Sequence, residues 1–363
     1  MIERHIDINR FDYDLPDGRI AKFPLPERSS SKLLVYRGGE ISEAHFADMG
    51  DVLPEGQLLV FNNTKVIRAR IIMHKPSGAR IEVFCLEPHD PADYERAFAV
   101  TGTCQWSCIV GNLKKWKEGY VEINFEHEGR PEHLRAWIAE NRGREHTVRF
   151  EWSAAMTFGQ LLEYLGRIPI PPYLNRESEL IDYTRYQTVY SKVNGSAAAP
   201  TAGLHFTPEL LEKIQAKGVN IGYVTLHVGL GTFRPVKEDD IEQHDMHSEY
   251  CVIPPETATL INETKARGGR VICVGTTSCR TLESWAQEDG HMEPSAGWTS
   301  IYIYPGYRFK VMDALVTNFH LPQSTLIMLV SALAGREHVL HAYEEAVKER
   351  YRFFSFGDAM FVS

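Results

Sequence analysis

Apolar runs typical of buried strands alternate with stretches of helical period along most of the chain. Strands are predicted at residues 57–61, 219–225, 270–274, 301–304 and 314–319, and helices at residues 209–217, 255–267, 280–287 and 324–335. Thr207 and Pro208 give the first of these helices a capped start, and Gly218 follows its end. This alternation predicts an α/β domain with parallel strands, in which ligands bind beyond the carboxyl ends of the strands.

Residues 66–150 follow a different pattern. Short β-like runs lie at residues 66–72, 80–86, 94–101 and 119–125, separated by turn residues such as Pro76 and Gly78. A helical period returns after Trp152, where Thr157 and Gln160 have the spacing of a capping box. We therefore predict a small β-barrel domain at residues 66–150, inserted into an α/β main domain formed by residues 1–65 and 151–363.

The formal net charge of the 363 residues is −9, which by itself disfavours a polyanionic partner. The acidity is uneven, because residues 66–150 carry 13 Lys and Arg against 12 Asp and Glu, whereas the remainder carries 26 against 36. No apolar run approaches the roughly 20 residues of a membrane-spanning helix. The charged N-terminus does not resemble a signal peptide, so we expect a cytoplasmic protein whose six cysteines are reduced.

Four segments combine small residues with histidine at predicted strand ends, at residues 199–207, 225–236, 275–283 and 318–325. Small residues let backbone amides approach a ligand, and helix N-termini favour anionic groups. Gly229 and Gly231 fit a simple tight turn equally well, and their spacing is not that of a dinucleotide fingerprint. Taken together, the four segments predict one shared polar pocket.

His205, His227, His247 and His320 lie in or beside these segments. A lone histidine near apolar residues is more often structural, but four at strand ends favour a common site. A zinc site is not expected, because the chain has neither H-E-x-x-H nor a paired C-x-x-C motif. The P-loop and the serine-hydrolase elbow are absent as well.

Glu249 has two interpretations, a general base or ribose ligand on one hand and a solvated loop residue on the other. Arg280 and Glu283 are three residues apart at a helix start, so they can share a face, and a surface ion pair is the commoner case. Replacing either Arg234 or Arg280 by Ala is expected to raise KM or lower kcat, with a change in stability of only about 0.5–1 kcal/mol, as for ordinary surface residues.

Several long phrases resemble those of one family, the S-adenosylmethionine:tRNA ribosyltransferase-isomerases of queuosine biosynthesis. The phrases are FDYDLP at 11–16, LLVFNNTKVIRAR at 58–70, IPIPPY at 168–173, YQTVY at 186–190, MHSE at 246–249 and IYPGY at 303–307, together with the four segments above. They follow the family order through nearly the whole chain. The resemblance implies an α/β domain that carries an inserted β-barrel, in agreement with the change of pattern near residues 66 and 150.

The resemblance also implies a reaction. The ribosyl part of S-adenosylmethionine is transferred to 7-aminomethyl-7-deazaguanine at the tRNA wobble position and isomerised, giving epoxyqueuosine with release of adenine and methionine. S-adenosylmethionine is then a consumed co-substrate, and no cofactor or metal is expected. The implied partner is a tRNA with a GUN-type anticodon, and we expect a monomer that does not bind membranes.

A base must remove the proton next to the sulfonium, and the candidates are His227, His247, Glu249 and His320. Arg234 and Arg280 suit a phosphate or the methionine carboxylate. The full set of expected substrate-binding residues is Thr201, His205, Phe206, Gly229, Gly231, Thr232, Arg234, Thr276, Thr277, Arg280, Glu283, Tyr304, Asn318, Ser324 and Thr325.

The insert departs from the family pattern. Where the family has an Arg-Pro-Ala-Lys-Lys-like run after a tryptophan, this chain has WSCIVGNLKKW at 106–116. Lys114, Lys115 and Lys117 keep the positive charge and are the expected tRNA contacts, although they would also keep a barrel edge soluble. Two alternatives stay open: an S-adenosylmethionine-dependent tRNA methyltransferase, whose glycine-rich loop is not evident, and a tRNA-binding protein without catalysis.

Overall fold

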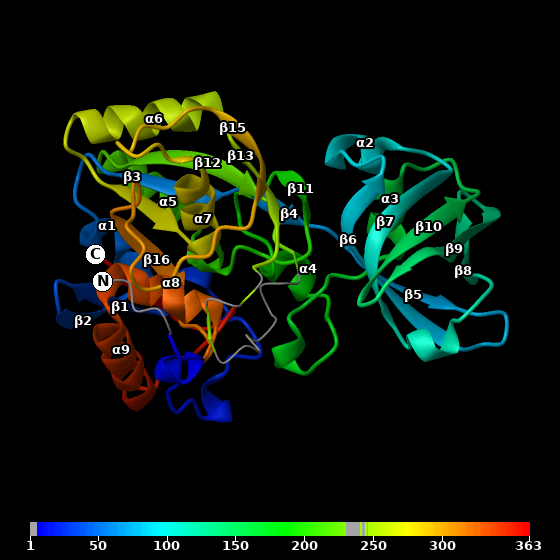
Figure 1. Cartoon of the computed structure of the whole chain (residues 1–363), viewed down its shortest axis with the longest axis horizontal. Coiled ribbons are helices and arrows are strands. Elements are labelled where there is room, and N and C mark those ends of the chain that lie inside the picture. The colour runs from blue at the N-terminus through cyan, green and yellow to red at the C-terminus, as the bar shows by residue number, and fades with distance from the viewer. Residues whose placement is uncertain (1–5, 230–239, 242–243, 245) are drawn as a thin grey trace.

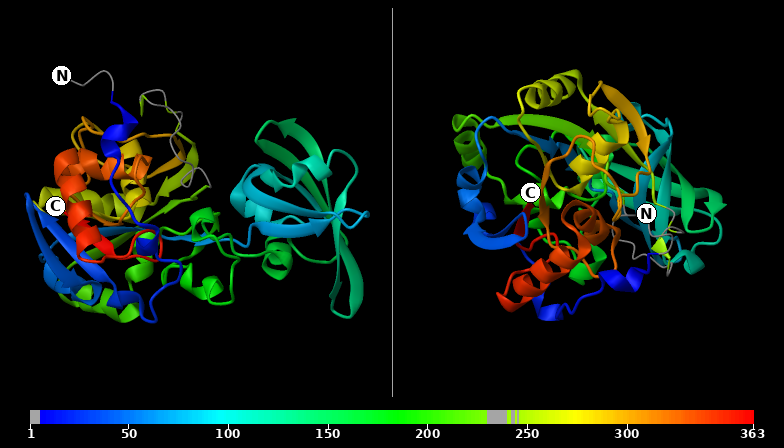
Figure 2. Two further views of the ribbon diagram at one scale, coloured as in Figure 1. Left: turned by 90° about the horizontal axis from the view of Figure 1, so that it is seen from below. Right: turned by 60° about the vertical axis from the view of Figure 1, so that its left-hand side comes forward.

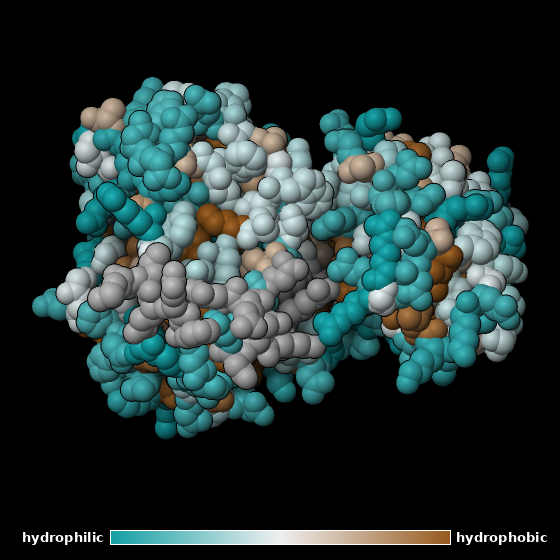
Figure 3. Space-filling model, viewed as in Figure 1, coloured by the Kyte–Doolittle hydropathy of each residue, from teal (hydrophilic) through white to brown (hydrophobic). Residues whose placement is uncertain are grey.

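The computed structural model describes residues 6–229, 240, 241, 244 and 246–363, and its ribbon separates into two domains (Figure 1). The space-filling view shows two lobes with a hollow between them and a mainly hydrophilic surface (Figure 3). Among the described residues, no helix combines the length and the apolar character that crossing a bilayer requires.

Within the described residues, a nine-stranded sheet forms the centre of the larger domain. Its strands, in order across the sheet, are β15 (Ser295–Thr299), β13 (Glu249–Ile253), β12 (Asn220–Leu226), β3 (Leu58–Asn62), β14 (Val271–Val274), β16 (Ala314–Asn318), β17 (Ala359–Val362), β1 (Lys32–Arg37) and β2 (Glu40–His45). The central strands β12, β3, β14 and β16 run parallel, as predicted. The pairs β13–β12, β15–β13, β17–β16 and β2–β1 are antiparallel, so the sheet is mixed.

Helices cover both faces of this sheet, as two views of the ribbon show (Figures 1 and 2). One face packs against α6 (Pro255–Ala266), α7 (Thr276–Trp285), α8 (Thr325–Ala334) and α9 (Arg336–Lys348), and the other against α1 (Met49–Val52) and α5 (Pro208–Ala216). Leu58 and Val60 of β3 belong to the first hydrophobic cluster, whereas Leu59 and Phe61 belong to the second. A strand buried on both faces reads as a continuous apolar run, which explains why β3 is recognisable in the sequence.

The smaller domain is a closed barrel, which confirms the predicted fold class. Its strands are β5 (Arg70–His74), β6 (Arg80–Asp90), β7 (Thr103–Gly111), β8 (Val121–His127), β9 (Arg130–Arg142) and β10 (Glu145–Trp152). The short helix α2 (Tyr94–Ala99) and α3 (Phe158–Leu165) pack against it, and the capping box of Thr157 and Gln160 starts α3. The barrel core thus includes α3, which follows the expected boundary at residue 150.

Two predicted strands are wrong. Most of the predicted strand 94–101 is the helix α2, Tyr94–Ala99, because the side chain of Asp93 accepts a hydrogen bond from Arg96 N and caps the helix. Residues 301–304 are not in a strand, and the sheet edge is formed by β15 just before them. The elements that were not predicted include strands β1, β2, β7, β9, β10, β13, β15 and β17 and helix α9.

Two short parallel strands link the domains. The chain enters the barrel after β4 (Thr64–Val66) and, on its return, passes through η6 (Pro172–Leu174) and α4 (Asp182–Arg185) to β11 (Val193–Ser196), which pairs with β4. The 3-10 helix η7 (Thr201–His205) then brings the chain to the sheet.

The carboxamide of Asn62, at the end of β3, joins three elements. Its Nδ2 donates to Leu226 O at 3.0 Å and to Thr277 Oγ1 at 3.2 Å, and its Oδ1 accepts from Leu226 N at 3.0 Å and from Thr64 N at 3.1 Å. All four hydrogen-bonding positions of this fully buried amide are filled. The ends of β3 and β12 and the start of α7 are therefore held together by one side chain.

Replacing Asn62 by Ala should lower the free energy of unfolding by about 2–4 kcal/mol, because Leu226 and Thr277 lose buried hydrogen-bond partners. Urea denaturation measures the loss. Asn63→Ala is the matched control, since this half-buried neighbour accepts one hydrogen bond, from Thr225 Oγ1 at 2.7 Å, and should cost about 1 kcal/mol or less. Equal losses for the two variants would contradict the role given to Asn62.

Candidate active site

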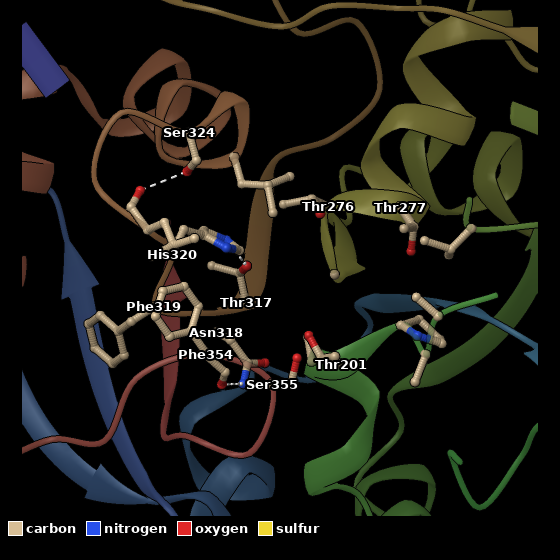
Figure 4. A pocket seen from close by; sticks show the side chains of 18 of the residues that line it. Thr201, Thr276, Thr277, Thr317, Asn318, Phe319, His320, Ser324, Phe354 and Ser355 are labelled. Atoms are coloured by element: carbon tan, nitrogen blue, oxygen red, sulfur yellow. Dashed lines mark hydrogen bonds between the residues drawn. The ribbon is translucent and has the colours of Figure 1, made fainter. Parts of the chain in front are cut away.

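A pocket lies at the carboxyl ends of β12, β14 and β16, where sequence analysis expected the unusual loops to meet (Figure 4). Six of the expected residues line it: Thr201, Thr276, Thr277, Asn318, His320 and Ser324. Thr317, Phe354 and Ser355 complete its polar and aromatic wall, and Ala199, Ala202 and Val228 supply apolar surface. All four of the segments singled out in the sequence contribute to this one concave site, together with Tyr173 and the 354–355 loop.

His320 is the histidine of this pocket. Its Nε2 lies 2.8 Å from Thr317 Oγ1, its backbone N–H donates to Tyr343 OH at 3.2 Å, and its carbonyl accepts from Tyr13 OH. Burial lowers the pKa of His320 to about 3, so the imidazole is neutral at neutral pH. A neutral imidazole is in the protonation state that a general base requires.

Two helix N-termini point into the pocket. Helix α7 begins directly after Gly275, whose φ of +88° favours glycine, and its first residues are Thr276 and Thr277. Helix α8 is capped by Ser324, whose side chain accepts from Ile327 N at 3.4 Å and donates to Leu321 O at 2.7 Å. The positive ends of two helix dipoles suit an anionic group at this wall.

A second cluster, beside the pocket, contains a buried ion pair. Arg280 Nη1 contacts Glu249 Oε2, while Glu249 Oε1 accepts from Gly229 N at 2.9 Å and lies 3.3 Å from His247 Nε2. Burial raises the pKa of Glu249, but Arg280, His247 and the Gly229 N–H together outweigh it and lower the pKa to about 2. Glu249 is therefore a fixed anion, and no partner of Arg280 Nη2 occurs in the described part of the chain.

The expected Arg280–Glu283 surface pair is wrong. Arg280 is 4% exposed and its partner is Glu249, 31 residues away. Glu283, 2% exposed, instead accepts hydrogen bonds from the backbone N–H groups of residues 310–312 and from Tyr307 OH. Because Arg280 is buried and ion-paired, we no longer expect Arg280→Ala to leave the stability of the protein nearly unchanged.

His227 faces the barrel. Its Nδ1 lies 3.1 Å from Thr64 Oγ1, which in turn contacts Ser196 Oγ at 2.7 Å. A Cβ on Gly195 would come within 2.5 Å of the imidazole, and the Tyr94 ring lies 4.3 Å away, centroid to centroid. Burial lowers the pKa of His227 to about 4, so this confined ring is also neutral.

The other expected site residues lie elsewhere. His205 contacts Ser31 Oγ at 2.8 Å and stacks on Phe46, against which Phe206 also packs in the core. Tyr304 packs against Tyr302, and Thr325 opens α8 outside the pocket lining. Lys114, Lys115 and Lys117 are exposed in the turn after β7, and Gly231, Thr232 and Arg234 lie outside the described residues.

Sequence reasoning missed Asn62, Thr64, Thr317 and Ser355. Asn62 and Thr64 follow an apolar run at a strand end, the same signal that picked out the other loops. Thr317 lies inside the predicted strand and Ser355 in a short loop before β17, so neither gave a signal. Among the described residues there is no group of three His, Cys, Asp or Glu that could hold a metal ion.

Arg280→Ala should cost about 3–5 kcal/mol at neutral pH, because it leaves Glu249 buried without its cation. Since folding lowers the pKa of Glu249 from 4.5 to about 2, the contribution of the pair is complete above pH 4.5 and is lost as the pH falls toward 2. Denaturation of the single and double Arg280/Glu249 variants across this range measures both effects.

The matched control is Arg149→Ala, which breaks an exposed pair with Glu151 and should cost less than about 1 kcal/mol. An Arg280→Ala loss as small as this control, or one independent of pH between 2 and 7, would contradict the burial argument.

Known proteins match this chain over both domains. A family model described as a queuosine biosynthesis protein matches residues 8–362. Among solved structures, S-adenosylmethionine tRNA ribosyltransferase from Thermotoga maritima is 36% identical, over 98% of this chain and 100% of that chain, with a TM-score of 0.53. The resemblance drawn from the sequence phrases is confirmed, and the chain belongs to the queuosine biosynthesis protein family.

Proposed function

We propose that the pocket at the ends of β12, β14 and β16 holds S-adenosylmethionine as the ribosyl donor. The chain is a transferase, an S-adenosylmethionine:tRNA ribosyltransferase-isomerase, by its family and by its likeness to the Thermotoga enzyme. The observation that carries the pocket assignment is its mixed wall, in which apolar residues adjoin the N-termini of α7 and α8. An apolar wall suits the adenine ring, and helix N-termini suit the methionine carboxylate.

The four candidate bases differ in their surroundings, and these differences distinguish their roles. Glu249 is held as an anion by Arg280, so it serves better to stabilise positive charge than to remove a proton. His247 contacts that carboxylate, and His227 faces the barrel. His320 is the candidate that lines the pocket, so we assign to it the removal of the proton next to the sulfonium.

The remaining partners follow from the reaction. The ribosyl group is transferred to the aminomethyl nitrogen of the deazaguanine and isomerised, while adenine and methionine leave. We propose that the tRNA has a GUN-type anticodon, that the enzyme acts as a monomer in the cytoplasm where tRNA is found, and that no cofactor beyond the consumed S-adenosylmethionine is needed, because the sulfonium itself activates the ribose.

The purified protein, given S-adenosylmethionine and tRNA that bears the deazaguanine amine, should release one adenine and one methionine per modified tRNA. His320→Gln should lower kcat by about 100-fold or more, the usual effect of removing an acid–base group. His338→Gln, on the exposed surface of α9, is the control and should leave kcat unchanged. Methylated tRNA with S-adenosylhomocysteine as the product would overturn the proposal.

The exposed lysines of the barrel, Lys114, Lys115 and Lys117, are proposed to contact tRNA phosphates. Replacing all three by Ala should weaken tRNA binding at low salt and lower the salt slope by about 0.7–0.9 for each phosphate that the protein no longer neutralises. Binding of S-adenosylmethionine should not change. Titrations of both proteins at several salt concentrations test this, and superimposable slopes would make the lysines solubilising residues only.

A further inference from the structure

Four rings from both domains meet between the lobes. Tyr94 on α2 lies 4.3 Å from His227 at the end of β12, and Tyr250 on β13 lies 6.5 Å from each of them, centroid to centroid. Trp298 on β15 is the cross-strand partner of Tyr250, with their centroids 5.6 Å apart. We call these four residues the aromatic row. The row runs from the β15 edge of the sheet to His227, which is one of the four candidate bases.

The row is open at its Trp298 end. Half of Trp298 is exposed, at 50%. In the described part of the chain the other exposed aromatic residues are Phe23 and Tyr164, and neither touches the row. Phe23 lies under the guanidinium of Arg176, and Tyr164 packs on Phe125 of the barrel. Unlike Phe23 and Tyr164, Trp298 is connected through Tyr250 to a candidate active-site residue, His227.

Among the described residues, the ionisable groups that bear on the row are Tyr94, Glu87, His227 and the Glu249–Arg280 ion pair. Burial raises the pKa of the Tyr94 phenol, and the charges of Glu87 and Glu249 raise it further. Burial, with the charges of Glu145 and Glu249, also raises the pKa of Glu87 to about 7. His227 is neutral. The charge of Glu249 is paired with Arg280, which leaves Glu87 and the neutral imidazole as hydrogen-bond acceptors for an amine. The row therefore suits a base that carries an amino group better than it suits the nucleic-acid backbone.

The chemistry of the substrate requires such a surface. An enzyme that reacts at a nucleobase takes the base out of its stack, and unstacked RNA bases are held on the faces of aromatic side chains. The acceptor here is an anticodon-loop base with an aminomethyl group, which is cationic at neutral pH until it gives up a proton. A stacking surface next to Glu87 meets both requirements.

We propose that the anticodon base that receives the ribosyl group stacks on the exposed ring of Trp298, beside Tyr250, whose ring is inclined by 68° to that of Trp298, with its amine directed toward His227 and Glu87. This inference rests on the proposed function. It assigns the acceptor base to the space between the domains, next to the 226–229 segment, whose Val228 lines the pocket that takes the donor. The barrel then contributes to the active site through Tyr94 and Glu87, in addition to any phosphate contacts.

The test is binding of an anticodon stem-loop RNA to wild type and to three Trp298 variants, without S-adenosylmethionine. Stacking on an aromatic residue corresponds to about a 5- to 150-fold change in affinity. Trp298→Ala and Trp298→Leu should both weaken binding by a factor in that range, whereas Trp298→Phe, which keeps a flat ring, should retain most of it. Phe23→Ala is the matched control for loss of an exposed aromatic residue.

The kinetic readout separates stacking from folding. The Trp298→Ala variant should raise the KM for RNA and leave the dissociation constant of S-adenosylmethionine unchanged. If Trp298→Leu binds RNA as tightly as Trp298→Phe, or if Trp298→Ala matches Phe23→Ala, the stacking proposal is overturned. A wild-type protein that binds RNA through Trp298 but releases no adenine would instead overturn the proposed function and leave the stacking site standing.

Discussion

The geometry of the site depends on one buried amide. Asn62 closes the end of the central strand β3, and its four hydrogen bonds hold β12 by both the N–H and the C=O of Leu226 while reaching the first turn of α7. Beyond the last paired residues of β3 and β12, the backbone ladder no longer holds the two chain segments together. A side chain that bridges them there sets the distance between the loops that follow.

Residues 227–229, which directly follow Leu226, contact different parts of the site. Val228 faces the pocket proposed for the donor, whereas His227 faces the barrel and the aromatic row. One residue further, the Gly229 N–H binds the Glu249 carboxylate. Three consecutive residues therefore touch the donor pocket, the acceptor side and the buried ion pair, so a shift of this short segment would move all three at once.

Local signals predicted much of the fold. The apolar run of β3, the capping box at Thr157 and the Thr207–Pro208 start of α5 are encoded by neighbouring residues, and each lies where the sequence placed it. The strand predicted at residues 94–101 is wrong because Asp93 caps a helix there, and this cap outweighs the β-like pattern of the residues that follow. The Arg280–Glu249 pair could not be predicted, since it joins side chains 31 residues apart that only the completed sheet brings together.

The position of β17 has a consequence for how the protein is made. This strand consists of residues 359–362, yet it lies between β16 and β1, and it pairs Val362 with Tyr36 near the other end of the numbering. The barrel, by contrast, is built from one continuous stretch of chain, so its contacts are closer in sequence. Contacts between distant residues form slowly, and domains tend to fold as units during synthesis. The barrel can therefore fold before β17 has been synthesised. In a nascent chain that stalls at that point, the edge of β1 that pairs with β17 is exposed in the catalytic domain.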